Sequence, residues 1–415
     1  MAILKAFKGI RPVKEKINLI AARPYDVLNK NEARKESEGN PYSYLHVTKP
    51  EIDLPDDVDQ YAPEVYKKGA ENFKKLLDDG IFVPDDKEYL YIYAQTMEGR
   101  TQYGIVGCAG VEDFMNNVIL HHEKTLPSKV EERKNHIRAS NVNYEPVFFT
   151  YPAVKEIDEI VASVVKEEPE YDFITDEGFG HHFWVIRNQE NINRIIELFA
   201  ELPNVYIADG HHRTTSAALI GNDRKENNPK HKGNEEYNFF LTVNFPDNQL
   251  HIIDYNRVVK DLNNNSEDEF FEKLKDKFIV EEKGEDIYKP INTHNFSMYF
   301  KGKWYSLTTK KGTFEENNPI GCLDVSIMSD NILNEILGID DLRKSKRIDF
   351  VGGIRGLGEL KHRVDNGEMA VAFALYPVSI AQLFDVADSG CIMPPKTTWF
   401  EPKLRSGLVV HSLED

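Results

Sequence analysis

Residues 205–219 read VYIADGHHRTTSAAL, in which an apolar run is followed by a glycine turn and then by a series of small residues. The run at 205–208 predicts a short strand, and the residues from Thr214 onward predict the opening of a helix. Glycine permits a tight turn, and the first turn of a helix leaves backbone N–H groups with partial positive charge, so this order suits an anion. Arg213 adds a guanidinium that matches phosphate oxygens. The segment therefore predicts a phosphate-binding turn.

The polar side chains of this turn suggest further chemistry. Asp209, at the strand tip, could hold a magnesium ion or orient a hydroxyl group, and His211 and His212 could neutralise developing charge or donate protons. Two alternatives stay open. The turn could be an Asp cap beside two surface histidines. The histidines could also bind zinc, although no Cys or His follows them at ligand spacing.

Helices and strands alternate on both sides of the turn, which predicts a mixed α/β fold. Residues 89–95 and 102–111 predict a hairpin of buried strands around Glu-Gly-Arg, and residues 61–79 predict an amphipathic helix. The proline-broken stretch 17–26 predicts strands that end in loops.

A polar, turn-rich segment at 262–268 predicts a domain boundary. We expect an N-terminal mixed α/β domain at 1–262, which carries the phosphate turn. We expect a C-terminal α/β domain at 263–415, which contributes Gly-rich and Pro-rich basic loops to a shared cleft.

Composition excludes several classes of protein. A chain of 415 residues exceeds what one hydrophobic core usually organises. Its 51 Lys and Arg against 69 Asp and Glu give a net charge of −18, which repels polyanions, so no nucleic-acid partner is expected. The three widely spaced cysteines form neither a disulfide framework nor a cysteine-only zinc site. No run approaches the ~18 apolar residues of a membrane helix, and no secretory leader pattern is present, so we expect a cytoplasmic protein with no membrane partner.

Several loops outside the turn carry polar groups suited to substrates. The cluster His121-His122-Glu123-Lys124-Thr125 lacks metalloprotease spacing, but Lys124 and Thr125 could touch substrate oxygens. A solvent-exposed charged helix downstream, with Arg133 and His136 on one face, is an equal alternative. Near the N-terminus, Asp26 lies two residues after a proline, and the candidates His46, Lys49 and Glu51 surround another.

Two segments near the C-terminus combine special backbone with cations. Residues 349–356 are glycine-rich and include Arg355, and residues 394–403 are proline-stiffened and include Lys396 and Lys403. These cations suit a second phosphate group, and an ordinary glycine turn and proline loop are the alternative. No P-loop motif is present, which disfavours a P-loop kinase.

The Asp-Gly-His-His-Arg turn at 209–213 resembles the phosphate-binding signature of the partition-protein-B (ParB)/sulfiredoxin superfamily. Together with residues 21–27, 122–125, 347–353 and 393–403, it makes nearly the whole chain resemble the family known as domain of unknown function 1015. The resemblance implies a ParB/sulfiredoxin-like phosphate-binding core with an additional mixed-sheet domain. His211 replaces the cysteine of the sulfiredoxin turn, so the thiol chemistry of that branch is excluded.

The same resemblance implies a free-serine kinase. It implies phosphoryl transfer to the hydroxyl of free L-serine, giving O-phosphoserine, from inorganic pyrophosphate, with ADP or ATP as other donors and Mg²⁺ as cofactor. The expected catalytic residues are Asp26 in place of the relatives' early glutamate, Asp209, which would also bind the metal, and His211. The expected phosphate-binding residues are Gly210, His212, Arg213, Thr214, Lys124, Arg355, Lys396 and Lys403. The expected substrate-binding residues are His46, Lys49, Glu51, His122, Glu123 and Thr125.

Two other functions remain open from the sequence. One is a non-catalytic, nucleotide-binding regulatory switch that uses the same turn. The other is a metal-dependent hydrolase built on the paired histidines. The sequence does not determine the oligomeric state, the direction of the reaction or whether the C-terminal loops close over a substrate.

Overall fold

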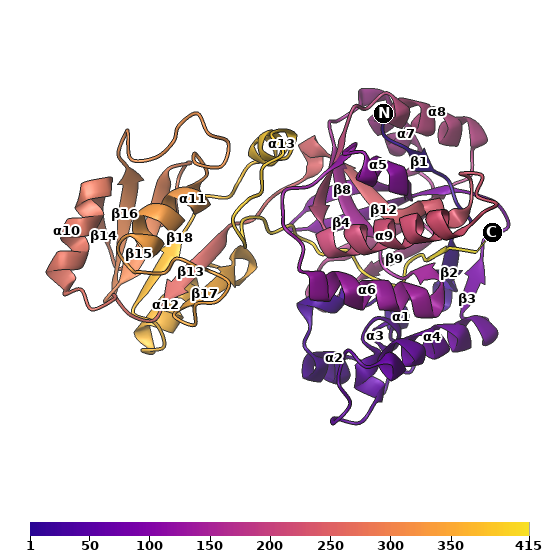
Figure 1. Ribbon diagram of the computed structural model, residues 1–415, viewed down its shortest axis with the longest axis horizontal. Coiled ribbons are helices and arrows are strands. Elements are labelled where there is room, and N and C mark those ends of the chain that lie inside the picture. The colour runs from indigo at the N-terminus through magenta and orange to yellow at the C-terminus, as the bar shows by residue number, and fades with distance from the viewer. Residues whose placement is uncertain (415) are drawn as a thin grey trace. The chain divides into compact units, whose positions relative to one another are not determined.

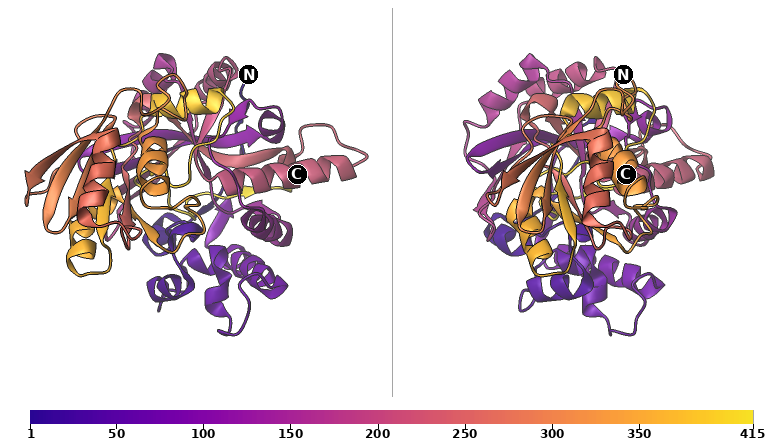
Figure 2. Two further views of the ribbon diagram at one scale, coloured as in Figure 1. Left: turned by 60° about the vertical axis from the view of Figure 1, so that its left-hand side comes forward. Right: turned by 90° about the vertical axis from the view of Figure 1, so that its left-hand side faces the viewer.

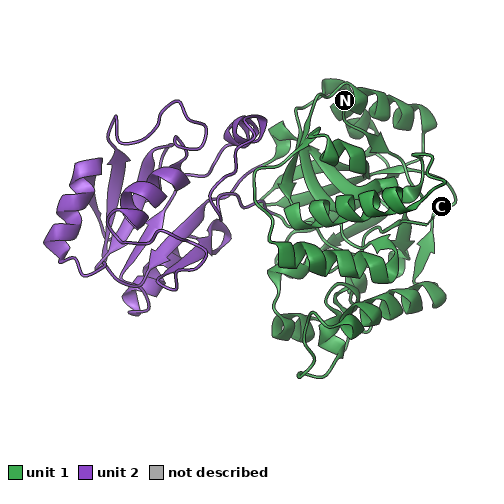
Figure 3. Cartoon of the chain, viewed as in Figure 1, with its two compact units in different colours: residues 1–250, 402–415 green, residues 251–401 purple. Residues whose placement is uncertain are grey.

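The computed structural model describes residues 1–414 and divides the chain into two compact units (Figure 3). Unit 1 comprises Met1–Leu250 and Pro402–Asp415, and unit 2 comprises His251–Glu401. The boundary therefore falls before the polar segment at 262–268, because the strand Tyr255–Val259 pairs with two strands of unit 2. The chain also returns to unit 1 after residue 401, a crossing that no local sequence pattern predicts.

Unit 1 is built on a nine-stranded mixed sheet (Figure 1). Its strands follow the order β6 (Ile119–Leu120), β11 (Val205–Asp209), β8 (Val147–Tyr151), β12 (Phe239–Pro246), β5 (Arg100–Gly110), β4 (Leu90–Met97), β10 (Gly180–Ile186) and β9 (Tyr171–Ile174), with β1 (Leu4–Lys5) also paired to β5. The pairs β6–β11 and β8–β12 are parallel and the others are antiparallel. This sheet confirms the mixed α/β class and the predicted hairpin, which is β4–β5.

The helices of unit 1 supply the apolar cover that a sheet requires. They are α1 (Ile17–Ile20), α2 (Lys30–Glu36), α3 (Leu45–Thr48), α4 (Pro63–Asp78), α5 (Val111–Met115), α6 (Pro127–Ser140), α7 (Lys155–Val164), α8 (Gln189–Ala200) and α9 (His211–Asn227). Five 3-10 turns, at Lys14–Lys16, Tyr25–Val27, Pro50–Asp53, Glu236–Asn238 and Asp247–Gln249, and two small sheets, β2 (Ile10–Pro12) with β3 (Phe82–Pro84) and β7 (Val142–Asn143) with β19 (His411–Ser412), complete the unit. The main core joins strands β4, β8 and β11 to helices α7, α8 and α9.

The predicted amphipathic helix is confirmed as α4, whose Val65, Phe73 and Leu76 are buried. The prediction of strands at 17–26 was wrong. That stretch forms α1 and the 3-10 turn Tyr25–Val27, because Ile17 and Ile20 both point into the core, a spacing that a helical turn provides and an alternating strand does not.

Unit 2 contains a six-stranded antiparallel sheet (Figure 2). Its order is β14 (Phe278–Gly284), β16 (Lys303–Thr309), β15 (Asn295–Phe300), β18 (Val371–Ala374), β13 (Tyr255–Val259) and β17 (Ile348–Gly352). Its helices are α10 (Glu267–Lys277), α11 (Asp324–Met328), which continues as a π-helix at Ser329–Asn334, then the 3-10 turn Gly353–Arg355, α12 (Leu357–Asp365) and α13 (Ile380–Asp388). Val258, Trp304 and Leu360 share a core between the sheet and α12. Within residues 1–414, none of the helices combines the length and apolar character that crossing a bilayer requires.

Gly210 joins β11 to α9 in the left-handed region, with φ +92° and ψ 31°. A Cβ at this position would lie 3.1–3.2 Å from three atoms of the Arg213 guanidinium. Glycine therefore suits this position in two ways, because L side chains rarely adopt this backbone conformation and a Cβ would crowd the guanidinium. The small residues that follow let α9 approach its neighbours, and Ser216 Oγ donates to the carbonyl oxygen of Val130 in α6 at 2.9 Å.

We expect Gly210→Ala to lower the free energy of unfolding by more than the ~1–2 kcal/mol that a left-handed alanine costs, because the methyl group also displaces Arg213. Gly39→Ala is the matched control, since Gly39 has φ +72° and a Cβ added there would have no atom within 4 Å. Guanidinium chloride unfolding of both variants measures the difference. Equal destabilisation would show that the guanidinium does not depend on the space above residue 210.

Candidate functional site

The first turn of α9 presents His211, His212 and Arg213, and no side chain caps it. Thr214 is the first residue whose amide closes a helical hydrogen bond, to the carbonyl oxygen of Gly210 at 2.9 Å. The preceding amides belong to the helix terminus, where partial positive charge accumulates. The predicted strand–glycine–helix arrangement is thus present, in a geometry that suits an anion.

Arg213 is a buried cation held in one position. Its side chain is 8% exposed, its Nη1 donates to the carbonyl oxygen of Pro146 at 2.7 Å, and its Nη2 lies 3.9 Å from Asp209 Oδ2. Burial opposes the charge, but Asp26, Glu145 and Asp209 together raise the pKa of Arg213. The guanidinium therefore stays charged.

Asp209 lies at the end of β11 and is paired with a residue far along the chain. Lys403 Nζ donates to Asp209 Oδ2 at 3.3 Å. Burial opposes ionisation of Asp209, but Lys403 and Arg213 lower its pKa to about 2. The structure thus brings together two predicted residues that are separated by almost two hundred positions.

Two histidines beside the turn are buried and uncharged. The rings of His122 and His211 meet edge to face with centroids 4.6 Å apart, and His211 Nδ1 lies 3.7 Å from Glu123 Oε2. Burial lowers the pKa of each histidine to about 3. His211 is therefore neutral near pH 7, which argues against a cationic role and leaves it a neutral hydrogen-bonding role.

His212 anchors the neighbouring loop. Its Nε2 accepts a hydrogen bond from the amide of Leu126 at 3.0 Å, so in the neutral ring the proton lies on Nδ1. Leu126 immediately precedes α6. Burial lowers the pKa of His212, although Glu123 and Asp26 act in the opposite direction.

Asp26 lies in the 3-10 turn Tyr25–Val27 and is exposed. Its carboxylate is close enough to Arg213 and His212 for its charge to oppose the effect of burial on the pKa of both groups. The turn is fixed by its neighbour, because the Tyr25 amide donates to Glu145 Oε1 at 3.1 Å. The Arg133 guanidinium also lies 3.8 Å from the centre of the Tyr25 ring.

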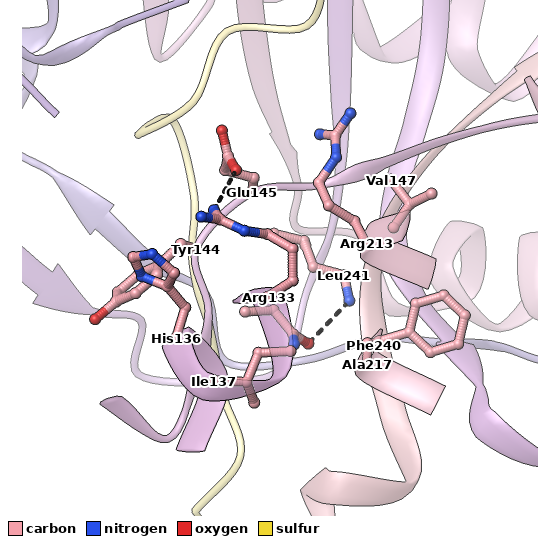
Figure 4. Close-up of a pocket in the computed structure, with 11 residues that line it drawn as sticks. Arg133, His136, Ile137, Tyr144, Glu145, Val147, Arg213, Ala217, Phe240 and Leu241 are labelled. Atoms are coloured by element: carbon pink, nitrogen blue, oxygen red, sulfur yellow. Dashed lines mark hydrogen bonds and ion pairs between the residues drawn. The ribbon is translucent and has the colours of Figure 1, made fainter. Parts of the chain in front are cut away.

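Arg133 and Glu145 form a buried cluster beside the turn that was not among the predicted site residues (Figure 4). Arg133 Nη1 lies 3.9 Å from Glu145 Oε2, and Ser406 Oγ donates to Glu145 Oε1 at 2.7 Å. Glu145 therefore connects the Asp26 turn, helix α6 and the C-terminal segment. No short motif marks Glu145 or Ser406, because their partners are distant in sequence.

The remaining predicted residues lie outside the turn at 209–213. His46 Nδ1 pairs with Asp53 at 2.7 Å and Lys49 Nζ with Glu51 at 3.0 Å, both next to α4. Lys124 is exposed and Thr125 half-buried in the loop before α6. Arg355 and Lys396 belong to unit 2, where Arg355 is exposed and lies 4.0 Å from Glu359, and Lys396 Nζ lies 5.6 Å from the centre of the Tyr255 ring.

The side chains of the turn do not by themselves make a metal site. Among residues 1–414, no group of three or more His, Cys, Asp or Glu side chains is arranged to hold an ion. The Asp209 carboxylate is already paired with Lys403, and the His212 Nε2 atom already accepts from Leu126. This arrangement gives no support to the zinc hydrolase alternative.

Three comparisons relate the chain to known proteins. The family model described as "Protein of unknown function (DUF1015)" matches residues 4–326. No curated protein matches the chain. Among solved structures, the chain is similar to a free serine kinase in complex with AMP, at 12% identity and TM-score 0.35, with 72% of this chain and 86% of that chain covered.

Two further solved structures are similar at the same level. A conserved hypothetical protein from Pyrococcus furiosus has 14% identity and TM-score 0.32, with 72% and 90% of the two chains covered. SbnI with a C-terminal truncation, from Staphylococcus aureus, has 12% identity and TM-score 0.36, with 71% and 82% covered. The structural likenesses carry no argument about activity. The family match covers most of the chain, and the protein therefore belongs to the family described as protein of unknown function (DUF1015).

Proposed function

We propose that the protein transfers a phosphoryl group to the hydroxyl of free L-serine, with inorganic pyrophosphate as the donor and ADP or ATP as alternative donors. One observation carries the proposal: the α9 N-terminus has no side-chain cap and lies beside the cations Arg213 and Lys403. The choice of acceptor rests on the Asp-Gly-His-His-Arg turn and its resemblance to free-serine kinases. Pyrophosphate concentrates several charges in a small volume and needs no adenine pocket.

The donor would bind at the α9 N-terminus. Backbone amides and the Arg213 guanidinium are preorganised there, so they would stabilise the charge on the phosphoryl oxygens without reorganising during the reaction. Lys403 would balance the negative charge that develops on the leaving group. His211, being neutral, would contribute a hydrogen bond rather than a charge.

Asp26 would take the proton from the acceptor. The serine Oγ forms a bond to phosphorus while the bridging P–O bond of the donor breaks, which releases orthophosphate when pyrophosphate is the donor. The hydroxyl proton passes to the Asp26 carboxylate. Glu145 acts as a positioning residue, because it holds the Tyr25 amide beside Asp26. Magnesium would enter this site only as an ion bound to the donor. Asp209, the one carboxylate of the turn at 209–213, would be the residue that contacts it.

Mass spectrometry of O-phosphoserine formed from serine with pyrophosphate, ADP or ATP tests the activity. We expect product with at least one donor, and a loss of about 10²–10⁴-fold in kcat for Asp26→Asn, since a positioned general base contributes on this scale. Asp57→Asn, which changes an exposed carboxylate in another loop, should retain wild-type activity. Nucleotide binding without product from any donor would contradict catalysis and favour a regulatory switch.

The buried histidines predict how stability depends on pH. An unfolded histidine has a pKa near 6.5 and folded His211 has a pKa of about 3, so the unfolded state binds more protons between these values. The histidine therefore does not lower the free energy of unfolding above pH 6.5. As the pH drops from 6.5 toward 3, the free energy of unfolding falls by about 1.4 kcal/mol per pH unit for each such histidine.

His211→Asn removes one of these histidines and its contribution to the pH dependence. We expect the unfolding free energy of this variant to fall less steeply than that of the wild type between pH 6 and pH 4. Urea unfolding at a series of pH values measures the slope. His362→Asn removes an exposed histidine and should leave the slope unchanged. Parallel slopes for wild type and His211→Asn would show that His211 is not held in the neutral form.

A further inference from the structure

A row of buried polar side chains crosses the sheet of unit 1. Gln95 in β4 pairs in register with Gln102 in β5 on one side and with His181 in β10 on the other. Their exposed fractions are 0%, 2% and 1%, respectively. Ile92 and Ala94 of β4 belong to the main apolar core, and successive residues of a strand alternate between its faces. The polar row therefore points to the face opposite that core.

The partners of Gln95 explain why an amide lies inside the sheet. An amide is unfavourable there unless it is hydrogen-bonded. Gln95 Oε1 accepts from Gln102 Nε2 at 3.0 Å, and Gln95 Nε2 donates to the carbonyl oxygen of Lys403 at 3.0 Å. The row thus holds the peptide group of a residue that lies 308 positions further along the chain.

A second anchor holds the backbone of Arg405, which follows Lys403 by two residues. The Tyr93 hydroxyl oxygen accepts from the Arg405 amide at 3.1 Å and donates its own proton to His181 Nδ1 at 2.7 Å. Burial lowers the pKa of His181 to about 3, so the ring is neutral and its Nδ1 can accept. Side chains of β4 therefore fix both the carbonyl group of Lys403 and the amide of Arg405.

The Lys403 side chain starts from this anchored backbone. Its ammonium reaches Asp209 Oδ2 at 3.3 Å, and the two side chains are 21% and 31% exposed. A lysine has a flexible four-carbon stem, and a partly exposed ion pair is too weak to hold such a stem on its own. The place of the ammonium therefore depends on where the backbone is held, and the hydrogen bond from Gln95 acts on the Lys403 peptide group itself.

We propose that Gln95 is a positioning residue, which holds the backbone of Lys403 so that the lysine ammonium lies beside Asp209 in the turn at 209–213. Gln95 contacts neither donor nor acceptor, and no covalent step involves it. Its effect on catalysis rests on the proposed function, whereas its effect on the Lys403 ammonium does not. One measurement without any substrate and one with substrates therefore separate the two.

Competitive acetylation of the folded, full-length chain with acetic anhydride tests the place of the ammonium without a substrate. We expect Lys403 to react about two- to fivefold faster in Gln95→Leu than in the wild type, because the ammonium is released from a partly exposed ion pair, whose strength is on this scale. Peptide mass spectrometry gives the rate. Asn244→Leu is the matched control, since it removes another buried amide of the same sheet, which donates to the carbonyl oxygen of Ile105, and it should leave the rate unchanged.

Tyr93→Phe is a second test, which also serves if Gln95→Leu does not fold. This variant keeps the ring and removes the oxygen that accepts from the Arg405 amide. We expect Lys403 to be acetylated faster than in the wild type, by a smaller factor than in Gln95→Leu, because the lost anchor is two residues away. A wild-type rate in whichever of the two variants folds would overturn the proposal.

Kinetics with serine and the phosphoryl donor test the consequence for catalysis. We expect Gln95→Leu to lower kcat about tenfold and to leave the KM for serine unchanged, which is the scale of one ordinary hydrogen bond. In a Lys403→Met background, Gln95→Leu should cause no further loss, because no ammonium is left to position. Additive losses in the double variant would overturn the proposal. A wild-type chain that forms no product would contradict the proposed function alone, and the acetylation rates would still decide the role of Gln95.

Discussion

The contact between Arg213 and the backbone of Gly210 lies at the centre of the polar groups around the turn at 209–213. The guanidinium lies over residue 210, where a Cβ would crowd it at 3.1–3.2 Å. From that position Arg213 reaches the carbonyl oxygen of Pro146 and approaches Asp209. The strand end, the helix start and the loop before β8 are thereby fixed around one cation, and the burial of that cation is tolerable because several carboxylates surround it.

The C-terminal segment completes this arrangement from outside the local sequence. Lys403 pairs with Asp209, Ser406 donates to Glu145, and Val410 forms a bridge with Ile10. Arg405 also donates to Glu177 at 2.7 Å. A short segment without long helices or strands of its own thus connects the Asp209 turn and Glu145 to the N-terminal loops.

Local patterns predicted much of this molecule, and long-range pairing explains what they missed. The hairpin β4–β5, helix α4 and the turn at Gly210 follow from periodicity and glycine chemistry over a few residues. The cluster of Arg133 with Glu145 could not be predicted in this way, since its members meet only when α6, β8 and the C-terminal segment have packed. Stretch 17–26 was misassigned because short apolar runs fit a helical turn as well as a strand.

The position of Lys403 has a consequence for how the protein is made. Unit 2 occupies residues 251–401, so the ribosome synthesises all of it before Lys403 and Ser406 emerge. The sheet of unit 1 can form earlier from its own residues, but Asp209 and Glu145 then lack two of their partners. During translation, the charge network around Asp209 and Glu145 therefore stays incomplete until unit 2 and then Lys403 and Ser406 have left the exit tunnel.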